Sequence, residues 1–225
     1  MPPPELAERA TLERTLAALG LPAEPAVLDR LQAYLALLQR WNATYNLTAI
    51  REPAQMLGQH LADCLAVVPP LQRQLGETAG RRLVDVGSGG GLPGVVLAVL
   101  LPGLQVTCVD TVGKKAAFVR QVAAELRLPN LKAEHARVES LKGPAADVVT
   151  SRAFASLADF VRLTAHLLAP GGVWMAMKGK RPDDEIAALP ATAAMFHVEP
   201  LAVPGLDAER CLVWLRPATG ALVHS

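Results

Sequence analysis

Apolar residues recur at helical spacing in the first part of the chain. Intervals of three or four residues between leucines predict one apolar face of a helix; these leucines are Leu28, Leu31, Leu35 and Leu38. Arg51–Pro53 predicts the first turn of a second helix, because proline is tolerated at that position. Pro69-Pro70 predicts the end of that helix, and the polar segment Gln72–Gly80 predicts a linker. We expect residues 1–70 to form a helical extension packed on the main domain.

Beyond residue 80 the pattern changes to short, β-rich apolar runs separated by helical segments rich in alanine and leucine. The runs are Leu83–Val86, Gln105–Val109, Leu131–Glu134, Asp147–Thr150 and Val173–Met177. This alternation predicts parallel strands joined by crossover helices, covered on both faces. Two final runs, Phe196–Val203 and Cys211–Arg216, leave little room for a crossover helix around Pro204-Gly205. They predict an antiparallel pair.

Five parallel strands followed by an antiparallel pair resemble the sheet plan of class I S-adenosylmethionine-dependent methyltransferases. We therefore expect a doubly wound, Rossmann-like α/β domain over residues 80–217. Its sheet should be mainly parallel with an antiparallel C-terminal pair, and the N-terminal helical extension should precede it.

The composition is sufficient for one sizeable hydrophobic core, and it gives the protein no strong overall electrostatic field. The chain has 225 residues, 51% of them hydrophobic. Its 22 basic residues nearly balance its 21 acidic ones. Binding to nucleic acid would therefore need a local basic patch rather than net charge.

Three cysteines lie far apart in the sequence, at Cys64, Cys108 and Cys211. An odd, scattered count argues against a disulfide framework and against zinc spacing. The first residues show no basic region followed by an apolar stretch, so we expect no signal peptide. The longest apolar run, Val95–Leu101, is far short of the ~20 residues that a membrane span needs. We expect a reduced, soluble, cytoplasmic protein with no metal and no membrane partner.

The most informative stretch is a predicted strand that runs into five glycines within eight residues, Gly87–Gly94, and then into a helix. Glycine lets the backbone turn sharply and lets a ligand approach where a Cβ would collide. The N-terminus of the helix supplies N–H donors for a carboxylate or a phosphate. The loop alone leaves two cofactors open, because Gly89, Gly91 and Gly94 also fit the dinucleotide fingerprint.

Two acids and the sheet plan favour S-adenosylmethionine as the cofactor. Asp85 stands two residues before the loop, where a carboxylate can orient the loop or meet the methionine ammonium. Asp110 closes the second strand, where it can accept hydrogen bonds from ribose hydroxyls; NAD enzymes share that acid. The antiparallel end of the sheet favours the methyltransferase.

Basic residues follow several of the predicted strands, and the carboxyl ends of parallel strands share one edge of the sheet. A basic rim on that edge indicates a polyanionic substrate. Arg137 and Arg152 follow the third and fourth strands. The residues that we expect to hold RNA phosphate are Lys114, Lys115, Lys178, Lys180 and Arg181.

Missing motifs narrow the chemistry. Amino-methylating enzymes carry (Asp/Asn)-Pro-Pro-aromatic after the fourth strand, where this chain has Thr150–Phe154. The three cysteines look like packing residues, so a thiolate nucleophile is not expected. Transfer to an acceptor with a free lone pair, such as guanine N7, remains, as does transfer to an oxygen or a small molecule. Arg152 and Lys178, with Phe154 as an apolar wall, are the candidate residues beside the reacting atoms.

Several motifs together resemble the RsmG (GidB) family of bacterial 16S ribosomal RNA guanine-N7 methyltransferases. They are Arg40-Trp41-Asn42 through Asn46-Leu47-Thr48, His60–Leu65, Asp85–Gly94, Gly113-Lys114-Lys115 and Ser151–Phe154. The resemblance implies contacts to S-adenosylmethionine from Gly87, Leu92, Val138, Glu139 and Arg152. It also implies a ribosomal RNA partner, and we expect a monomer. The family often has proline where this chain has Gly90.

Some residues and functions stay open at this point. Trp41 and Tyr45 either pack on the main domain or stack on RNA. For His60 and Asp63 we favour a surface hydrogen bond over catalysis. An NAD oxidoreductase would need an acid–base residue near the strand ends, where His135 is the one candidate. A silent RNA-binding module is the other alternative.

Overall fold

The computed structural model describes residues 4–45, 47 and 60–218, so the helix start predicted at Arg51–Pro53 lies outside the described residues. The strands are β1 Arg82–Val86, β2 Gln105–Asp110, β3 Leu131–His135, β4 Ala146–Ser151, β5 Leu168–Lys178, β6 Ala193–Pro200 and β7 Cys211–Pro217. The α-helices are α1 Pro4–Ala18, α2 Pro25–Tyr45, α4 Ala62–Leu65, α5 Val68–Leu75, α6 Gly94–Leu100, α7 Gly113–Glu125, α8 Leu157–Thr164 and α9 Asp183–Ala187. Two 3-10 helices are η2 Val138–Ser140 and η3 Ala165–Leu167.

All seven strands form one sheet in the order β3-β2-β1-β4-β5-β7-β6. Strands β1 to β5 are parallel, and β7 pairs antiparallel with both β5 and β6. The predicted fold class is therefore confirmed, including the antiparallel C-terminal pair. The prediction placed β6 too late in the chain: it ends at Pro200 because the partner strand begins at Cys211, opposite Pro200.

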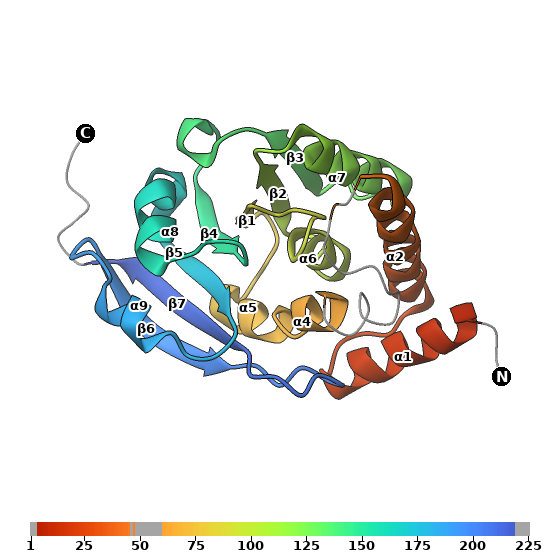
Figure 1. Cartoon of the computed structure of the whole chain (residues 1–225). Helices are drawn as coiled ribbons and strands as arrows, with labels where there is room; N and C mark the ends of the chain where they lie inside the picture. The colour runs from red at the N-terminus through yellow and green to blue at the C-terminus, as the bar shows by residue number, and fades with distance from the viewer. Residues whose placement is uncertain (1–3, 46, 48–59, 219–225) are drawn as a thin grey trace.

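Alternate residues of the strands pack into two apolar layers, one on each face of the sheet. On one face Leu83 and Val106 join the cluster that contains the buried residues of α1, α2, α4, α5, α6 and α7. On the other face Val84 and Val149 pack with Phe160 of α8. Figure 1 shows α2 lying beside α6 and α7, and α8 on the opposite side of the sheet near β4 and β5.

The four leucines predicted to share a helical face are all buried in α2, in the same cluster as α6 and α7. The prediction that Pro69-Pro70 ends a helix is wrong. Both prolines lie in the first turn of α5, which runs on to Leu75. Proline is tolerated there because first-turn N–H groups have no partner within the helix. The predicted linker therefore starts at Gly76 rather than Gln72.

One buried side chain joins α6 to the start of β3. Asn130 donates from Nδ2 to the carbonyl oxygens of Ala98 and Leu104, both at 3.0 Å, and to that of Leu101 at 3.4 Å. The carbonyls of Ala98 and Leu101 lie at the C-terminal end of α6, where helical carbonyls lack partners of their own, and that of Leu104 lies in the turn after the helix. Asn130 thus satisfies a helix end that is sealed from water.

We expect Asn130→Ala to lower the free energy of unfolding by about 1–3 kcal/mol, because buried carbonyls lose their donor. Urea unfolding followed by circular dichroism measures this change. Gln72→Ala, on the exposed side of α5, is the control and should change stability little. Equal midpoints for the two variants would contradict the role of Asn130.

Candidate active site

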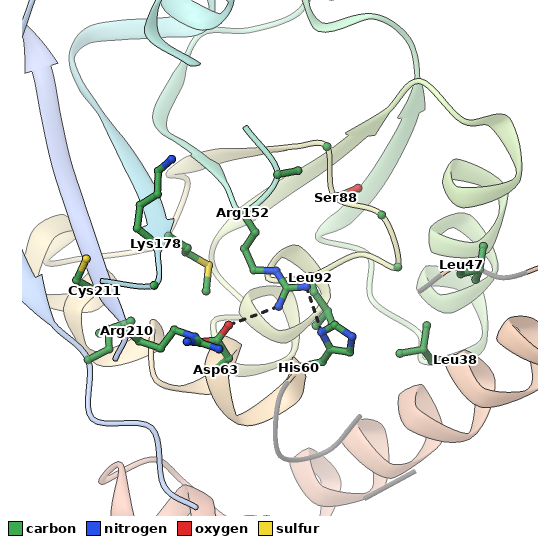
Figure 2. A pocket seen from close by; sticks show the side chains of 17 residues that line it. Leu38, Leu47, His60, Asp63, Ser88, Leu92, Arg152, Lys178, Arg210 and Cys211 are labelled. Atoms are coloured by element: carbon green, nitrogen blue, oxygen red, sulfur yellow. Dashed lines mark hydrogen bonds and ion pairs between the residues drawn. The ribbon is translucent and has the colours of Figure 1, made fainter. Parts of the chain in front are cut away.

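A cavity of about 480 Å³ opens at the carboxyl edge of the sheet. Its floor is the loop between β1 and α6, and its sides come from the ends of β4 and β5, from α2 and α4, and from the segment before β7. Figure 2 shows how the lining side chains converge from these elements. They are Leu38, Leu47, His60, Asp63, Gly87, Ser88, Gly89, Gly90, Leu92, Arg152, Ala153, Met177, Lys178, Gly179, Leu201, Arg210 and Cys211.

The floor of the cavity is held by the carboxylate of Asp110. Its Oδ2 accepts from the N–H of Gly89 at 2.9 Å, and its Oδ1 accepts from the N–H of Val112 at 2.8 Å. Gly89 has a φ of +58°, a conformation that glycine adopts without strain. No described atom lies within 4 Å of the position that a Cβ would take at Gly89, so a side chain there would project into the cavity.

Asp85 lies beneath the same loop, fully buried. Its Oδ2 accepts from the N–H of Gly94 at 2.9 Å, which holds the start of α6 against β1. Among the described residues its Oδ1 has no hydrogen-bond partner. Burial raises the pKa of Asp85 to about 7, with the Gly94 N–H opposing that rise. We predicted that Asp85 either orients the loop or meets the methionine ammonium, and this geometry supports the first role.

The first helices of the chain also hold the loop, which the sequence did not indicate. The hydroxyl of Tyr34 in α2 donates to the carbonyl of Gly90 at 2.7 Å. A Cβ at Gly90 would stand 3.0 Å from Cδ1 of Leu38, so glycine permits the close approach of α2. Tyr34 lies on the apolar face of α2, where the leucine pattern alone marks it as a packing residue.

Arg152, predicted to lie in the site, is the centre of a polar cluster on the wall of the cavity. Its guanidinium donates to Nδ1 of His60 at 3.3 Å and lies 3.6 Å from Oδ2 of Asp63 (Figure 2). It also contacts Sγ of Cys64 at 3.7 Å. Burial and the Arg152 charge lower the pKa of His60 to about 4, so this imidazole is neutral at pH 7. Burial raises the pKa of Cys64 to about 12 and keeps its thiol protonated.

We predicted a surface hydrogen bond for His60 and Asp63, and this prediction is wrong for Asp63, which is buried. Its relative exposure is 7%, and its partners are Arg152 and Arg210. Arg210 was not predicted: its Nε donates to Oδ1 of Asp63 at 3.1 Å, and its Nη1 donates to the carbonyl of Glu209 at 2.8 Å. Nothing near Arg210 in the sequence marks it, because its partner is 147 residues away.

Lys178 lines the cavity but has a carboxylate of its own. Its ammonium lies 2.8 Å and 3.0 Å from the two carboxylate oxygens of Glu185 in α9. Figure 2 shows this ammonium turned away from Asp63 and Arg210. Phe154 packs on Phe160 with ring centroids 5.2 Å apart, so its ring belongs to the α8 side of the sheet. For Lys178 to bind a phosphate, the ion pair with Glu185 would have to open.

The other predicted residues lie around the cavity rather than on its lining. Gly91 is beneath the loop, where a Cβ would stand 2.6 Å from Cγ2 of Val95. Val138 is buried with the α8 side of the core, and Glu139 pairs with Arg137 at 3.6 Å.

Four of the predicted RNA-binding residues, Lys114, Lys115, Lys180 and Arg181, flank the cavity at the ends of β2 and β5. The ammonium of Lys114 donates to the carbonyl of Tyr45 at 2.9 Å. Arg181 donates to Asp183 at 2.6 Å. These four residues therefore divide into two groups separated by β1 and β4, and Arg152 at the end of β4 lies between them.

Trp41 packs on the main domain, one of the two roles left open for it. Its ring lies 5.4 Å from that of Phe118, and its Nε1 donates to Gln121 at 3.1 Å. Tyr45 contacts Trp41 with ring centroids 5.0 Å apart and is exposed. His135 hydrogen-bonds the carbonyl of Thr111 outside the cavity lining, so the acid–base candidate of the hydride-transfer alternative does not lie in the cavity.

All three cysteines are free and buried, as expected of packing residues. Among the described residues no group of three or more histidine, cysteine, aspartate or glutamate side chains is placed to hold a metal ion. Across the described ranges no helix is both long and apolar enough to cross a membrane.

Comparison with known proteins yields one family and one fold. A family model described as GidB, rRNA small subunit methyltransferase G, matches residues 27–213. The ribosomal RNA small subunit methyltransferase G of Leptothrix cholodnii is 64% identical over 214 residues, which cover 95% of this chain and 98% of the relative.

Solved structures agree on the fold. TrmN from Thermus thermophilus is similar with a TM-score of 0.54 and 22% identity, over 72% of this chain and 53% of that one. A S-adenosylmethionine-dependent methyltransferase from Thiobacillus denitrificans, solved with S-adenosyl-L-homocysteine, has a TM-score of 0.51 and 15% identity, over 67% of this chain and 90% of that one.

The raised pKa of Asp85 makes stability depend on pH in a defined direction. The folded protein keeps the proton up to about pH 7, whereas an unfolded aspartate loses it near pH 4. The unfolded state then binds fewer protons, so the free energy of unfolding falls as pH rises through this window. A tenfold change in proton affinity corresponds to about 1.4 kcal/mol, so the total fall is several kcal/mol.

We expect Asp85→Asn to remove this component while keeping an acceptor for the Gly94 N–H. Urea unfolding of both proteins at intervals from pH 4 to pH 8 measures the difference between their free energies of unfolding. Groups that titrate alike in both proteins do not contribute to this difference. Parallel pH profiles for the two proteins would contradict the assignment.

Proposed function

This chain belongs to the rRNA small subunit methyltransferase G family, as its motifs predicted, and we propose from that premise that it methylates N7 of a guanine in 16S ribosomal RNA with S-adenosylmethionine. The family match over residues 27–213 is the observation that carries this proposal. The cavity at the glycine loop supports it. A cytoplasmic location follows from such a substrate.

The residues around the glycine loop fit S-adenosylmethionine. A volume of about 480 Å³ lies within the ~300–1,000 Å³ typical of ligand pockets. At Gly89 the missing Cβ leaves room that a ligand can take, and the loop is fixed in advance by Asp110 and Asp85. We assign cofactor binding to Asp85, Gly87, Gly89, Gly91, Leu92, Asp110, Val138, Glu139 and Arg152.

Each oxygen of Asp110 has a second lone pair, so the carboxylate can hold the loop and still accept from a ribose hydroxyl. Arg152 is a cation beside the loop and suits the carboxylate of the methionine end. For RNA we assign the phosphate contacts to Lys114, Lys115, Lys178, Lys180 and Arg181.

Guanine N7 suits a site without a general base. When bound, S-adenosylmethionine supplies an electrophilic methyl group, which the in-plane lone pair of N7 can accept without losing a proton. The protein then has to position the base and exclude water. The lowered pKa of His60 makes its imidazole a weak proton acceptor, the Cys64 thiol is protonated, and Arg152 and Lys178 are cations that can donate to the guanine edge but cannot act as bases.

The direct test is methyl transfer from radiolabelled S-adenosylmethionine to unmodified 16S ribosomal RNA, free and in the small subunit. Nucleosides from the digested product are then separated and identified by mass. We expect 7-methylguanosine. Label on any other atom or base would overturn the N7 assignment, and absence of label from both substrates would overturn the function.

We expect the single-turnover rate at saturating cofactor to be nearly flat from about pH 6 to pH 8.5, because the acceptor releases no proton. His60 titrates near pH 4, below this range. Asp85, with a pKa of about 7, titrates within it, so the profile of Asp85→Asn is measured beside that of the wild type. Rapid-quench kinetics on the purified enzyme measure the profile. A rise with unit slope would show an obligatory deprotonation, which the N7 acceptor does not need.

We expect Asp110→Ala to weaken S-adenosylmethionine binding by tenfold or more, since charge-assisted hydrogen bonds contribute about 1.5–3 kcal/mol each. The variant also loses the bond that holds Gly89. Isothermal calorimetry measures the affinity. Asp147→Ala is the control, because this carboxylate pairs with Arg81 far from the cavity lining. An unchanged affinity in a folded Asp110 variant would remove the role.

A further inference from the structure

One carboxylate on the wall of the cavity lies between two guanidinium groups. Asp63 Oδ2 is 3.6 Å from Nη1 of Arg152, and its Oδ1 is 3.1 Å from Nε of Arg210. The Asp63 side chain is 10% exposed, and the two arginine side chains are 26% and 27% exposed. A single carboxylate balances only one of the two charges, so this cluster keeps one net positive charge facing the cavity.

Of the other charges near the cavity, Asp85 interacts with Arg152 and offsets part of its charge when ionised, whereas Lys178 and His60 add nothing to the excess. Lys178 is neutralised by Glu185, and the lowered pKa of His60 leaves its ring neutral. Burial raises the pKa of Asp63, while both guanidiniums oppose that rise. An uncompensated charge in a partly buried wall is costly unless an anion meets it. The cluster is therefore suited to an anionic ligand.

The two arginines lie on either side of Asp63, with Arg152 nearer the glycine loop in the strand order. The glycine loop follows β1, and Arg152 follows the neighbouring strand β4. Arg210 comes directly before β7, three strands away from β1 in the order β1-β4-β5-β7. With strands about 4.8 Å apart, that distance is roughly 14 Å. Figure 2 shows Arg210 on the far side of Asp63 from Ser88 of the loop.

We propose that Arg210 binds a phosphate of the RNA beside the acceptor nucleotide, and that Asp63 positions Arg210 toward the RNA and Arg152 toward the cofactor. This inference rests on the proposed function. The guanidinium fork matches phosphate oxygens, and it presents five N–H donors. Asp63 and the carbonyl of Glu209 engage Nε and Nη1, and among the described residues these contacts leave further donors of Arg210 for a ligand oxygen.

The test is Arg210→Gln, compared with Arg216→Gln in the adjoining strand β7. Arg216 is exposed and lies over the ring of Phe196, outside the cavity lining. Fluorescence anisotropy with a labelled 16S RNA fragment measures affinity at several salt concentrations, and calorimetry measures S-adenosylmethionine affinity. For Arg210→Gln we expect RNA affinity to fall about tenfold and the salt slope to fall by ~0.7–0.9, as for one lost phosphate contact. Cofactor affinity should not change.

Two further variants separate positioning from folding. Arg210→Lys keeps the charge but loses the fork, so it should keep the salt slope and recover part of the affinity. Asp63→Asn frees both guanidiniums and should weaken both ligands. The double variant Asp63→Asn/Arg210→Gln should weaken RNA binding by less than the product of the fold-changes of the two single variants, because both residues act on one contact with the RNA.

An unchanged RNA salt slope in Arg210→Gln, or an equal loss in Arg216→Gln, would overturn the proposal. So would a loss of cofactor affinity that matches the loss of RNA affinity. Binding is measured without methyl transfer, so failure of wild-type protein to methylate RNA would count against the proposed function alone. If Arg210→Gln does not fold, the Arg210→Lys measurements decide.

Discussion

The cavity depends on a glycine loop that has almost no side chains of its own to hold it, and two carboxylates supply the missing contacts. Asp85 and Asp110 end neighbouring parallel strands, and each accepts from backbone N–H groups of the loop or of the turn beside it. Such bonds fix the loop before any ligand arrives, which spares the binding step the cost of ordering it. Asp85 achieves this fully buried, at the expense of a strongly perturbed pKa.

Most of the fold follows from local pattern. The apolar runs predicted the parallel strands, and the short connection between the last two runs predicted the antiparallel pair, because both features depend on neighbouring residues. The errors have equally local causes. Pro69-Pro70 can end one helix or begin the next, and only the packing of α5 decides between them. The bounds of β6 depend on where β7 begins, which the sequence of β6 does not contain.

The site was predicted in part. The glycine loop and the strand ends predicted Gly89 and Lys178, and the family resemblance predicted Gly87, Leu92 and Arg152; all five line the cavity. Tyr34 and Arg210 were missed because their roles come from contacts with residues 56 and 147 positions away. Asp63 was predicted to make a surface hydrogen bond, which is wrong. Helical spacing does not indicate that two arginines, one after β4 and one before β7, pair with its carboxylate. Distant pairs of this kind carry no sequence signature of their own.

The position of β7 between β5 and β6 has a consequence for synthesis of the chain. A ribosome makes β6 before β7, yet among the described strands β6 pairs with β7 alone, so the growing chain exposes β5 as an open sheet edge until β7 emerges. That edge includes Trp174 and Met175, which are buried in the finished protein. An unpaired apolar edge can pair with another chain. The risk of misassembly therefore lasts until the β6–β7 hairpin closes the sheet, and the same hairpin delivers Arg210 and Cys211 to the cavity.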